Sequence, residues 1–297
     1  MMSRLKVLAL LSTASLCAPA FGANPARPGT LNYIEGSAYL EGKPLTPQSV
    51  GSTDLNPGQV LSTGQGKAEI LLTPGVFLRL DDNSSVQMVS PGLTFTQLRL
   101  ESGRATVEVD EIYPQNDIQI INGGVPTQLL KAGLYEFNAG SNTTEVFTGK
   151  AAAHEADGHW MVIKGHHELA LNAGDALKPQ DFDTRTAQDD LYKWSSLRSQ
   201  YLSEANMQLA QQYAGGPGFA PGWYWDPYLF DYTFFGPYPF FSPFGWGFYP
   251  FGYVGSFYGR GIYGGRGYYG GREVGGRAFA GAGGFHGGGG GGGGGHR

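Results

Sequence analysis

The sequence predicts an all-β fold (an antiparallel roll, sandwich or β-solenoid), followed by one C-terminal α-helix and a disordered Gly- and aromatic-rich tail. The main observation is the run 61–109, in which short alternating segments are separated by Gly, Pro, Asp, Asn and Ser turns. Val76, Leu78 and Leu80 share one face of a strand, and Arg79 lies on the other. Such a period of two places one face in a core and the other in water, so we expect Arg79 to face solvent.

The same alternation recurs along the rest of the first 180 residues. Ala105, Val107 and Val109 form one face of a strand, with Thr106 and Glu108 on the other. A first hairpin is expected over 31–45, and the main array begins at 58–64. Further strands are expected at 117–121, 128–132, 133–138, 145–147, 150–154, 159–164 and 168–171, with hairpin turns at 138–142 and 156–158. Short strands at this spacing favour a sandwich, roll or solenoid over a parallel α/β sheet.

Between 186 and 213 the period becomes helical. Asp189 and Asp190 lie near the start, where the helix dipole favours negative charge, and the Gly-Gly-Pro at 215–217 ends the helix. We expect the helix to pack an apolar stripe on the sheet. A helix lying on a membrane is the alternative, although its polar face has no cationic bias. The stripe comprises Leu191, Trp194, Leu197, Tyr201, Met207 and Leu209.

The tail has a different composition from the rest of the chain. Of 49 glycines, 30 follow residue 213, together with 25 of the 40 aromatic residues. Residues 219–258 are interrupted by prolines, which excludes a membrane-spanning helix, and we expect partial order there at best. Residues 259–297 include nine consecutive glycines, whose ordering costs the most backbone entropy, so we expect disorder.

The N-terminus has the three parts of a secretory signal peptide. Arg4 and Lys6 precede the apolar stretch 7–16, and small residues follow. We expect cleavage after Gly22 or Ala23, and therefore an exported protein in the periplasm or outside the cell. Cys17 lacks the small preceding residue of a lipoprotein site. Since this is the one cysteine of the sequence, the mature protein would have no disulfide and no thiol chemistry.

The strand array also carries the motif order of a known family. The segments in order are 61–64 (LSTG), 68–72 (AEILL), 74–80 (PGVFLRL), 98–105 (LRLESGRA), 132–137 (AGLYEF), 146–151 (VFTGKA) and 171–175 (LNAGD). Over about 120 residues this pattern resembles the FecR domain, the extracytoplasmic sensor module of bacterial iron-citrate-type signal transducers. Glycines 64, 75, 103, 133, 149 and 174 fall where a strand must reverse or approach another backbone.

The resemblance implies a secreted or periplasmic module that binds another protein. Family members place a cytoplasmic anti-sigma segment and a membrane helix before this domain. Here the expected signal peptide leads directly into it, which puts a direct role in restraining a sigma factor in doubt. The expected organisation is a signal peptide at 1–23, the FecR-like β domain at 24–180, a packing helix at 181–213, an aromatic and Pro-rich segment at 214–258 and the Gly-rich tail at 259–297.

No motif in the sequence predicts catalysis, a cofactor or a metal. The histidines of the expected folded region have none of the familiar metal-ligand spacings, although His154 and His159 would face each other across the 156–158 turn. Adjacent carboxylates at 81–82 and 189–190 favour turn and cap roles over acid/base chemistry. Ser84, Ser102 and Ser195 lack a nucleophile-elbow context. The histidines are His154, His159, His166 and His167.

The expected function is therefore non-enzymatic: interaction with an envelope protein, or alternatively with a cell-wall polymer or polysaccharide through aromatic side chains of the tail. Stacking surfaces are expected at Trp223, Trp225, Tyr228 and Trp246. Nucleic acid is not an expected partner, because residues 24–213 carry 13 Lys and Arg against 22 Asp and Glu. Arginines among tyrosines in the tail resemble RNA-binding segments, but an exported acidic protein seldom meets RNA. The partner and the oligomeric state stay open.

Overall fold

The computed structural model describes residues 25–155, 157–171, 177–212 and 220–251. The expected signal peptide and Gly-rich tail lie outside these residues, as does Gly174. Its helices are η1 (Pro47–Ser49, a 3₁₀ turn) and α1 (Asp190–Gln212). The strands are β1 (Leu31–Leu40), β2 (Lys43–Pro44), β3 (Val60–Leu71), β4 (Val76–Leu80), β5 (Ser85–Pro91), β6 (Phe95–Ser102), β7 (Arg104–Val109), β8 (Asp117–Asn122), β9 (Val125–Leu129), β10 (Gly133–Asn138), β11 (Thr143–Val146), β12 (Lys150–His154), β13 (Trp160–Lys164), β14 (His167–Ala170), β15 (Gln180–Asp181), β16 (Gly222–Asp226), β17 (Asp231–Phe235), β18 (Phe240–Phe241) and β19 (Gly247–Phe248).

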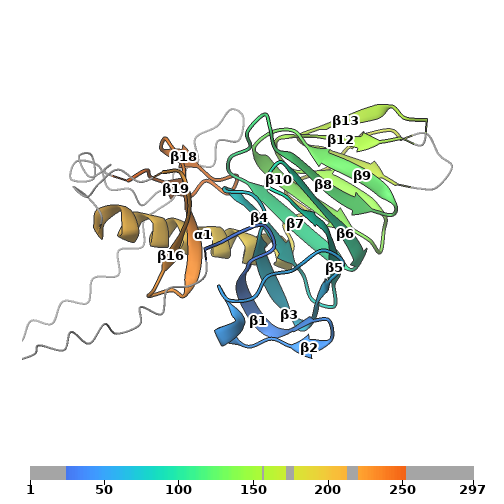
Figure 1. Cartoon of the computed structure of the whole chain (residues 1–297). Helices are drawn as coiled ribbons and strands as arrows, with labels where there is room; N and C mark the ends of the chain where they lie inside the picture. Colours follow the sequence, from blue (N-terminus) through green and yellow to red (C-terminus); the bar gives the residue numbers. More distant parts are fainter. Residues whose placement is uncertain (1–24, 156, 172–176, 213–219, 252–297) are drawn as a thin grey trace, which may run out of the picture.

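The first fifteen strands form one long, coiled sheet. Its hydrogen-bonded order is β13-β12-β9-β8-β6-β5-β3-β4-β7-β10-β11-β14-β15, with β1 paired to β3 and β2 to β1. Neighbours are antiparallel except for β6 and β8, which are parallel. In Figure 1, β5 to β13 lie at one side of the molecule and α1 with β16 to β19 at the other. The predicted fold class, mostly β-structure with a single α-helix, is confirmed for the described residues.

The inner face of the sheet encloses the main apolar core. Leu78, Val107 and Phe137 are fully buried in it, and they come from the adjacent strands β4, β7 and β10. Leu98 and Ile120 reach the same core from the parallel pair β6 and β8. The period-two alternation therefore identifies the inner face correctly.

The outer face of β4 and β7 is not exposed to water. Arg79, Thr106 and Glu108 are all fully buried, although the alternation predicts a solvent-facing side. That prediction is wrong because a second layer, α1 with the hairpin β16–β17, covers this part of the sheet. Alternation separates two faces, but it does not say what packs against each.

The helix packs through a mixed face rather than the expected apolar stripe. Leu191, Trp194 and Leu209 are buried as expected, whereas Leu197 and Tyr201 are exposed. The rest of the buried face is largely polar or small and comprises Ser195, Arg198, Ser199, Leu202, Ala205, Asn206 and Ala210. Polar side chains occur on this face because it meets the polar outer face of β4 and β7.

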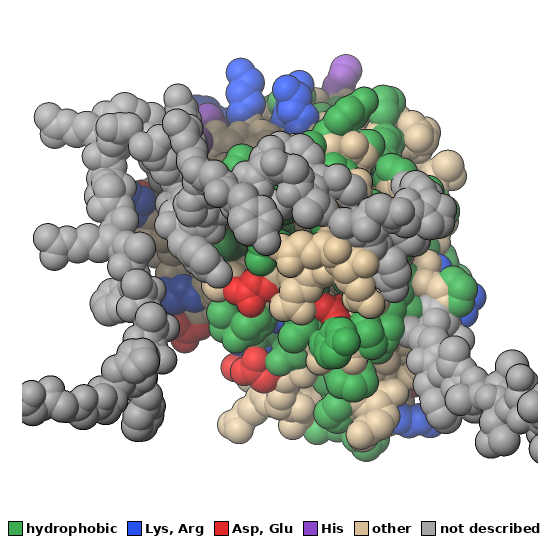
Figure 2. Space-filling model, turned by 90° about the vertical axis from the view of Figure 1, so that its left-hand side faces the viewer, with side chains coloured by type: hydrophobic (Ala, Val, Ile, Leu, Met, Phe, Trp, Pro, Cys, Tyr) green, Lys and Arg blue, Asp and Glu red, His purple; other side chains and the backbone are tan. Residues whose placement is uncertain are grey.

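The aromatic and Pro-rich segment is more ordered than expected. It forms the hairpin β16–β17 and the short hairpin β18–β19. Phe234 and Phe248 are fully buried in a second core with Phe77 of β4 and Leu202 of α1. Figure 2 shows the side of the molecule on which α1 and β16 to β19 lie, where hydrophobic side chains are mixed with a few acidic ones.

Two of the glycines singled out in the sequence have clear steric roles. Gly103 has a φ of +72°, and a Cβ there would lie 2.1 Å from Ser84 Oγ. A Cβ on Gly133 would lie 2.3 Å from the carbonyl oxygen of Thr148. Both positions need a residue without a side chain, because the neighbouring chain segments at Ser84 and Thr148 approach too closely for one.

Candidate functional site

The space between the sheet and the helix holds a buried layer of charged side chains. Arg79 of β4 donates from Nε to Glu69 of β3 at 2.7 Å, and from Nη1 to Glu108 of β7. All three side chains have no exposed surface. The three lie next to each other across the sheet, since Glu69 pairs with Arg79 in register and β4 pairs with β7.

Arg198 of α1 joins this layer to the second hairpin. Its Nη2 donates to Glu69 at 3.1 Å and to Asp231 of β17 at 2.9 Å. The guanidinium carbon lies 3.9 Å from the ring centre of Tyr33 on β1, a cation–π contact. One side chain therefore contacts β1, β3 and β17 at once.

The layer shifts the pKa values of its carboxyl groups in opposite directions. Burial alone would raise the pKa of Glu69, but Arg198 and Arg79 lower it below its usual range. Burial raises the pKa of Asp231 to about 6, with Arg198 opposing the shift. Burial, followed by the charge of Glu108, raises the pKa of Asp110 well above its usual range. The layer thus holds carboxyl groups whose pKa values burial and the two arginines shift in opposite directions.

Hydrogen bonds extend the layer along the helix. Ser199 Oγ donates to Glu108 Oε1 at 2.6 Å, and Asn206 donates to the Phe234 carbonyl oxygen at 3.0 Å. Asn32 of β1 donates to Glu69 at 2.8 Å and accepts from the Tyr232 amide at 2.6 Å. These groups fix the helix and hairpin on the sheet, and their burial gives them a structural role.

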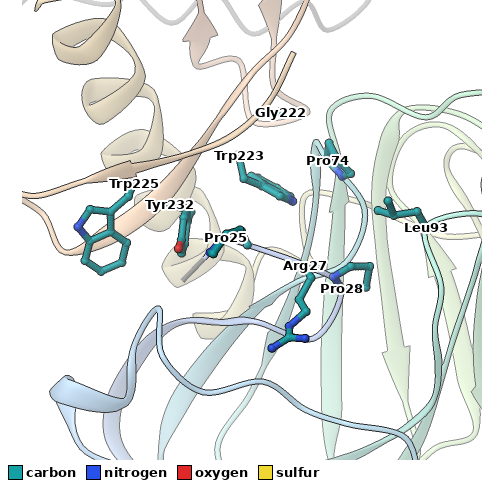
Figure 3. Close-up of a pocket in the computed structure, with 10 residues that line it drawn as sticks. Pro25, Arg27, Pro28, Pro74, Leu93, Gly222, Trp223, Trp225 and Tyr232 are labelled. Carbon is teal, nitrogen blue, oxygen red and sulfur yellow. The ribbon is translucent and has the colours of Figure 1, made fainter. Parts of the chain in front are cut away.

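A second candidate place is a cavity beside the hairpin β16–β17. It has a volume of about 360 Å³ and an apolar lining that includes three prolines and Leu93. Figure 3 shows Trp223 between Pro25 and Pro74, with Trp225 farther along, beyond Tyr232. Trp223 also packs edge-to-face on Phe77, at 4.8 Å between ring centres. Aromatic side chains form part of the cavity wall, and the indole of Trp223 also packs against the second core.

The four aromatic residues predicted as stacking surfaces do not form one surface. Trp223 and Trp225 share the cavity. Tyr228 lies in the turn between β16 and β17 and is 74% exposed. Trp246 packs against α1, where its Nε1 donates to the Ser196 carbonyl oxygen at 3.0 Å. Their predicted role in binding stays a prediction.

The polar residues weighed in the sequence have local partners. His154 lies opposite Trp160, with 4.8 Å between the ring centres, rather than opposite His159. Ser195 Oγ contacts Thr106 Oγ1 at 3.0 Å. Asp189 caps α1 by accepting from the Tyr192 amide at 3.0 Å. In the described part of the chain no three His, Cys, Asp or Glu side chains are grouped to hold a metal ion.

No helix among the described residues is long and apolar enough to cross a membrane.

A third candidate place is strand β13, the end of the long sheet. Its hydrogen-bonded neighbour is β12, and no other described strand pairs with it. Beyond one end of the β12–β13 ladder, the Gly165 amide donates to the Gly149 carbonyl oxygen. Beyond the other end, the Glu155 amide donates to the His159 carbonyl oxygen, so both flanking pairs are hydrogen-bonded pairs. Hydrogen-bonded and non-hydrogen-bonded pairs alternate in an antiparallel ladder. The backbone groups of Trp160, Val162 and Lys164 therefore point away from β12, toward the open edge.

The same three residues expose their side chains. Trp160 is 44% exposed, Val162 is 39% exposed, and Lys164 is exposed as well. Ile163, between Val162 and Lys164, is buried. On β12, the opposite residues of this outward face are His154, Ala152 and Lys150. The edge thus offers backbone donors and acceptors together with an apolar, basic surface.

The sequence predicts the strand at this edge but not its position at the end of the sheet. Residues 159–164 are predicted as a strand, and Trp160, Val162 and Lys164 alternate with Met161 and Ile163. Which strand ends the sheet depends on pairing order, which alternation does not contain. The buried layer is hinted at by Arg79 within the otherwise apolar segment 76–80.

No protein-family model and no curated protein matches the chain. Two crystal structures of a "putative anti-sigma factor" from Parabacteroides distasonis are partly similar to it. Each is 12% identical over 43% of this chain, with a TM-score of 0.38. The chain covers 62% of their length, less than two thirds. The resemblance to the FecR family therefore rests on the sequence motifs.

Substitution of Arg198 tests the buried layer. Arg198→Met keeps an unbranched chain of similar length but leaves Glu69 and Asp231 without this guanidinium. Because removal of one partner leaves a buried charge uncompensated, we expect the free energy of unfolding to fall by about 3 kcal/mol. Urea unfolding measures this. The control is Lys193→Met on the exposed side of α1, and an equal effect of the two changes would contradict the account.

Glu136 makes stability depend on pH. Glu136 of β10 lies in register with Glu145 of β11, and its buried Oε2 has no hydrogen-bond partner among the described residues. Burial, followed by the charges of Glu145 and Asp189, raises the pKa of Glu136 from 4.5 to about 8. The folded state therefore holds this proton more tightly than the unfolded chain does. The protonated Glu136 side chain therefore makes its full contribution to the free energy of unfolding below pH 4.5. This contribution is lost as the pH rises through about 8.

Glu136→Gln removes this dependence while keeping an acceptor for Arg104. We expect equal stability of wild type and variant at pH 4, and a growing advantage of the variant up to pH 8, by at most about 1.4 kcal/mol per pH unit. Thermal unfolding at a series of pH values measures it. Exposed Glu101→Gln is the control. Parallel wild-type and Glu136→Gln profiles would contradict the assignment.

Proposed function

We propose that the chain is an exported, non-enzymatic FecR-type module of the bacterial cell envelope that binds another protein. The signal-like N-terminus and the ordered FecR-like motifs support export and family. The single observation that carries protein binding is the open edge of β13. In this strand, Trp160 and Val162 have exposed side chains, and their backbone groups point away from β12 toward the open edge.

An open edge of this kind fits β-strand addition. In that mode an extended segment of the partner continues the sheet, main-chain hydrogen bonds supply affinity, and alternate side chains supply specificity. Unpaired sheet edges are commonly blocked in stable proteins because they pair readily with other chains. An edge that keeps Trp160 and Val162 exposed is therefore a candidate for use.

Binding of an envelope polysaccharide is the second proposal. The cavity lined by Trp223 and Trp225 favours it, because aromatic faces stack on sugar rings. Deletion of residues 214–297 does not separate the two proposals. It would also remove Asp231, which pairs with Arg198, and Phe234 from the second core. Point substitutions are needed instead.

Val162→Pro tests strand addition. Proline removes the outward amide of Val162, which the β12–β13 ladder does not use, and proline is tolerated on edge strands. We expect capture of envelope proteins from a detergent extract by the purified chain to fall at least ten-fold. Val162→Ala, which keeps the amide, should reduce it only slightly.

Circular dichroism and a thermal melt establish that Val162→Pro is folded. Unchanged capture by the folded Val162→Pro variant would refute protein binding through this edge. Sedimentation with purified peptidoglycan that is lost in Trp225→Ala but kept in Val162→Pro would favour the polysaccharide proposal.

A further inference from the structure

The outward surface of β12 and β13 is ordered in three cross-strand rows. Lys150 lies opposite Lys164, Ala152 opposite Val162, and His154 opposite Trp160. Leu130, 37% exposed, bonds through its amide to the Lys150 carbonyl oxygen and so extends the first row. The surface thus changes from two lysines at one end to an aromatic pair at the other.

The lysine pair, Lys150 and Lys164, has no ion-pair partner among the described residues. Like charges directly opposite each other on neighbouring strands destabilise a sheet. The lysines lie on a chain whose residues 24–213 are acidic overall, with 13 Lys and Arg against 22 Asp and Glu. An acidic group placed beside Lys164 would therefore gain from both lysines.

We propose that the edge of β13 accepts an antiparallel strand of a partner protein in which an acidic, an apolar and an aromatic residue occupy alternate positions, all three on the same face of the sheet as Lys164, Val162 and Trp160. This inference rests on the proposed protein-binding function and adds the chemistry of the partner. In antiparallel register the acidic residue lies opposite Lys164, the apolar one opposite Val162 and the aromatic one opposite Trp160. Antiparallel addition is chosen because its pairing is more stable per residue than parallel pairing.

A second copy of this chain is a poorer occupant. Antiparallel self-pairing centred on Val162 would place Lys164 of each copy beside Trp160 of the other and would leave both lysine pairs without a carboxylate. Edge lysines commonly prevent self-association of sheets. The net negative charge of residues 24–213 adds repulsion between copies.

Peptide binding to the purified chain tests the proposal. The probe is a fluorescent heptapeptide, Thr-Glu-Thr-Val-Thr-Tyr-Thr, and its partner probe carries Lys in place of Glu. We expect fluorescence anisotropy to show binding of the Glu peptide that is about ten-fold tighter than that of the Lys peptide at low salt, since attraction is replaced by repulsion. The double variant K150E/K164E should reverse the preference, and V162P should abolish binding of both peptides.

Each other outcome overturns the proposal. A preference for the Lys peptide, or no preference, excludes an acidic partner strand. Peptide binding that V162P leaves unchanged excludes strand addition. A concentration-dependent dimer in analytical ultracentrifugation that V162P abolishes assigns the edge to a second copy.

Capture from the envelope extract separates this inference from the function on which it rests. If V162P keeps full capture, protein binding through the edge fails. If V162P loses capture and K150E/K164E keeps it, only the acidic partner strand fails.

Discussion

The structure depends on the pairing of two buried arginines with carboxylates between the sheet and its second layer. Arg79 holds Glu69 and Glu108 on the sheet, and Arg198 connects Glu69 to Asp231 on the hairpin. Buried charges are costly unless they are paired, so each part of this layer needs the others. The helix and the aromatic hairpins therefore belong to the same folded unit as the sheet.

This arrangement also leaves one part of the sheet without a second layer, and the proposed partner binding is placed there. The second layer covers the outer face of β4 and β7, and the main core fills the inner face. The end of the sheet at β13 has no such cover from a described strand. Its outward backbone groups coincide with exposed apolar and basic side chains, which is why the proposed protein binding and the proposed acidic partner strand both concentrate on this edge.

Sequence patterns predict the strands well, because alternation and turn residues are local. The strands Gly133–Asn138 and Lys150–His154 have the predicted bounds. The buried layer was not predictable in the same way, because Arg79 becomes buried only when a helix more than 100 residues later covers it. The sequence does not predict the order of the aromatic segment for a related reason: Phe234 and Phe248 pack against distant elements. Of the four predicted stacking residues, Trp223 and Trp246 also have packing roles that spacing alone does not contain.

Residue-resolved amide hydrogen exchange of the purified chain tests the role of the buried ionic layer. If the ionic layer makes sheet, helix and hairpin one cooperative unit, the central amides of α1 and β17 should exchange with the same free energy of opening as those of β4 and β7. Opening of α1 and β17 at a free energy several kcal/mol below that of β4 and β7 would contradict the account. The helix and hairpin would then be a separately unfolding layer on an independent sheet.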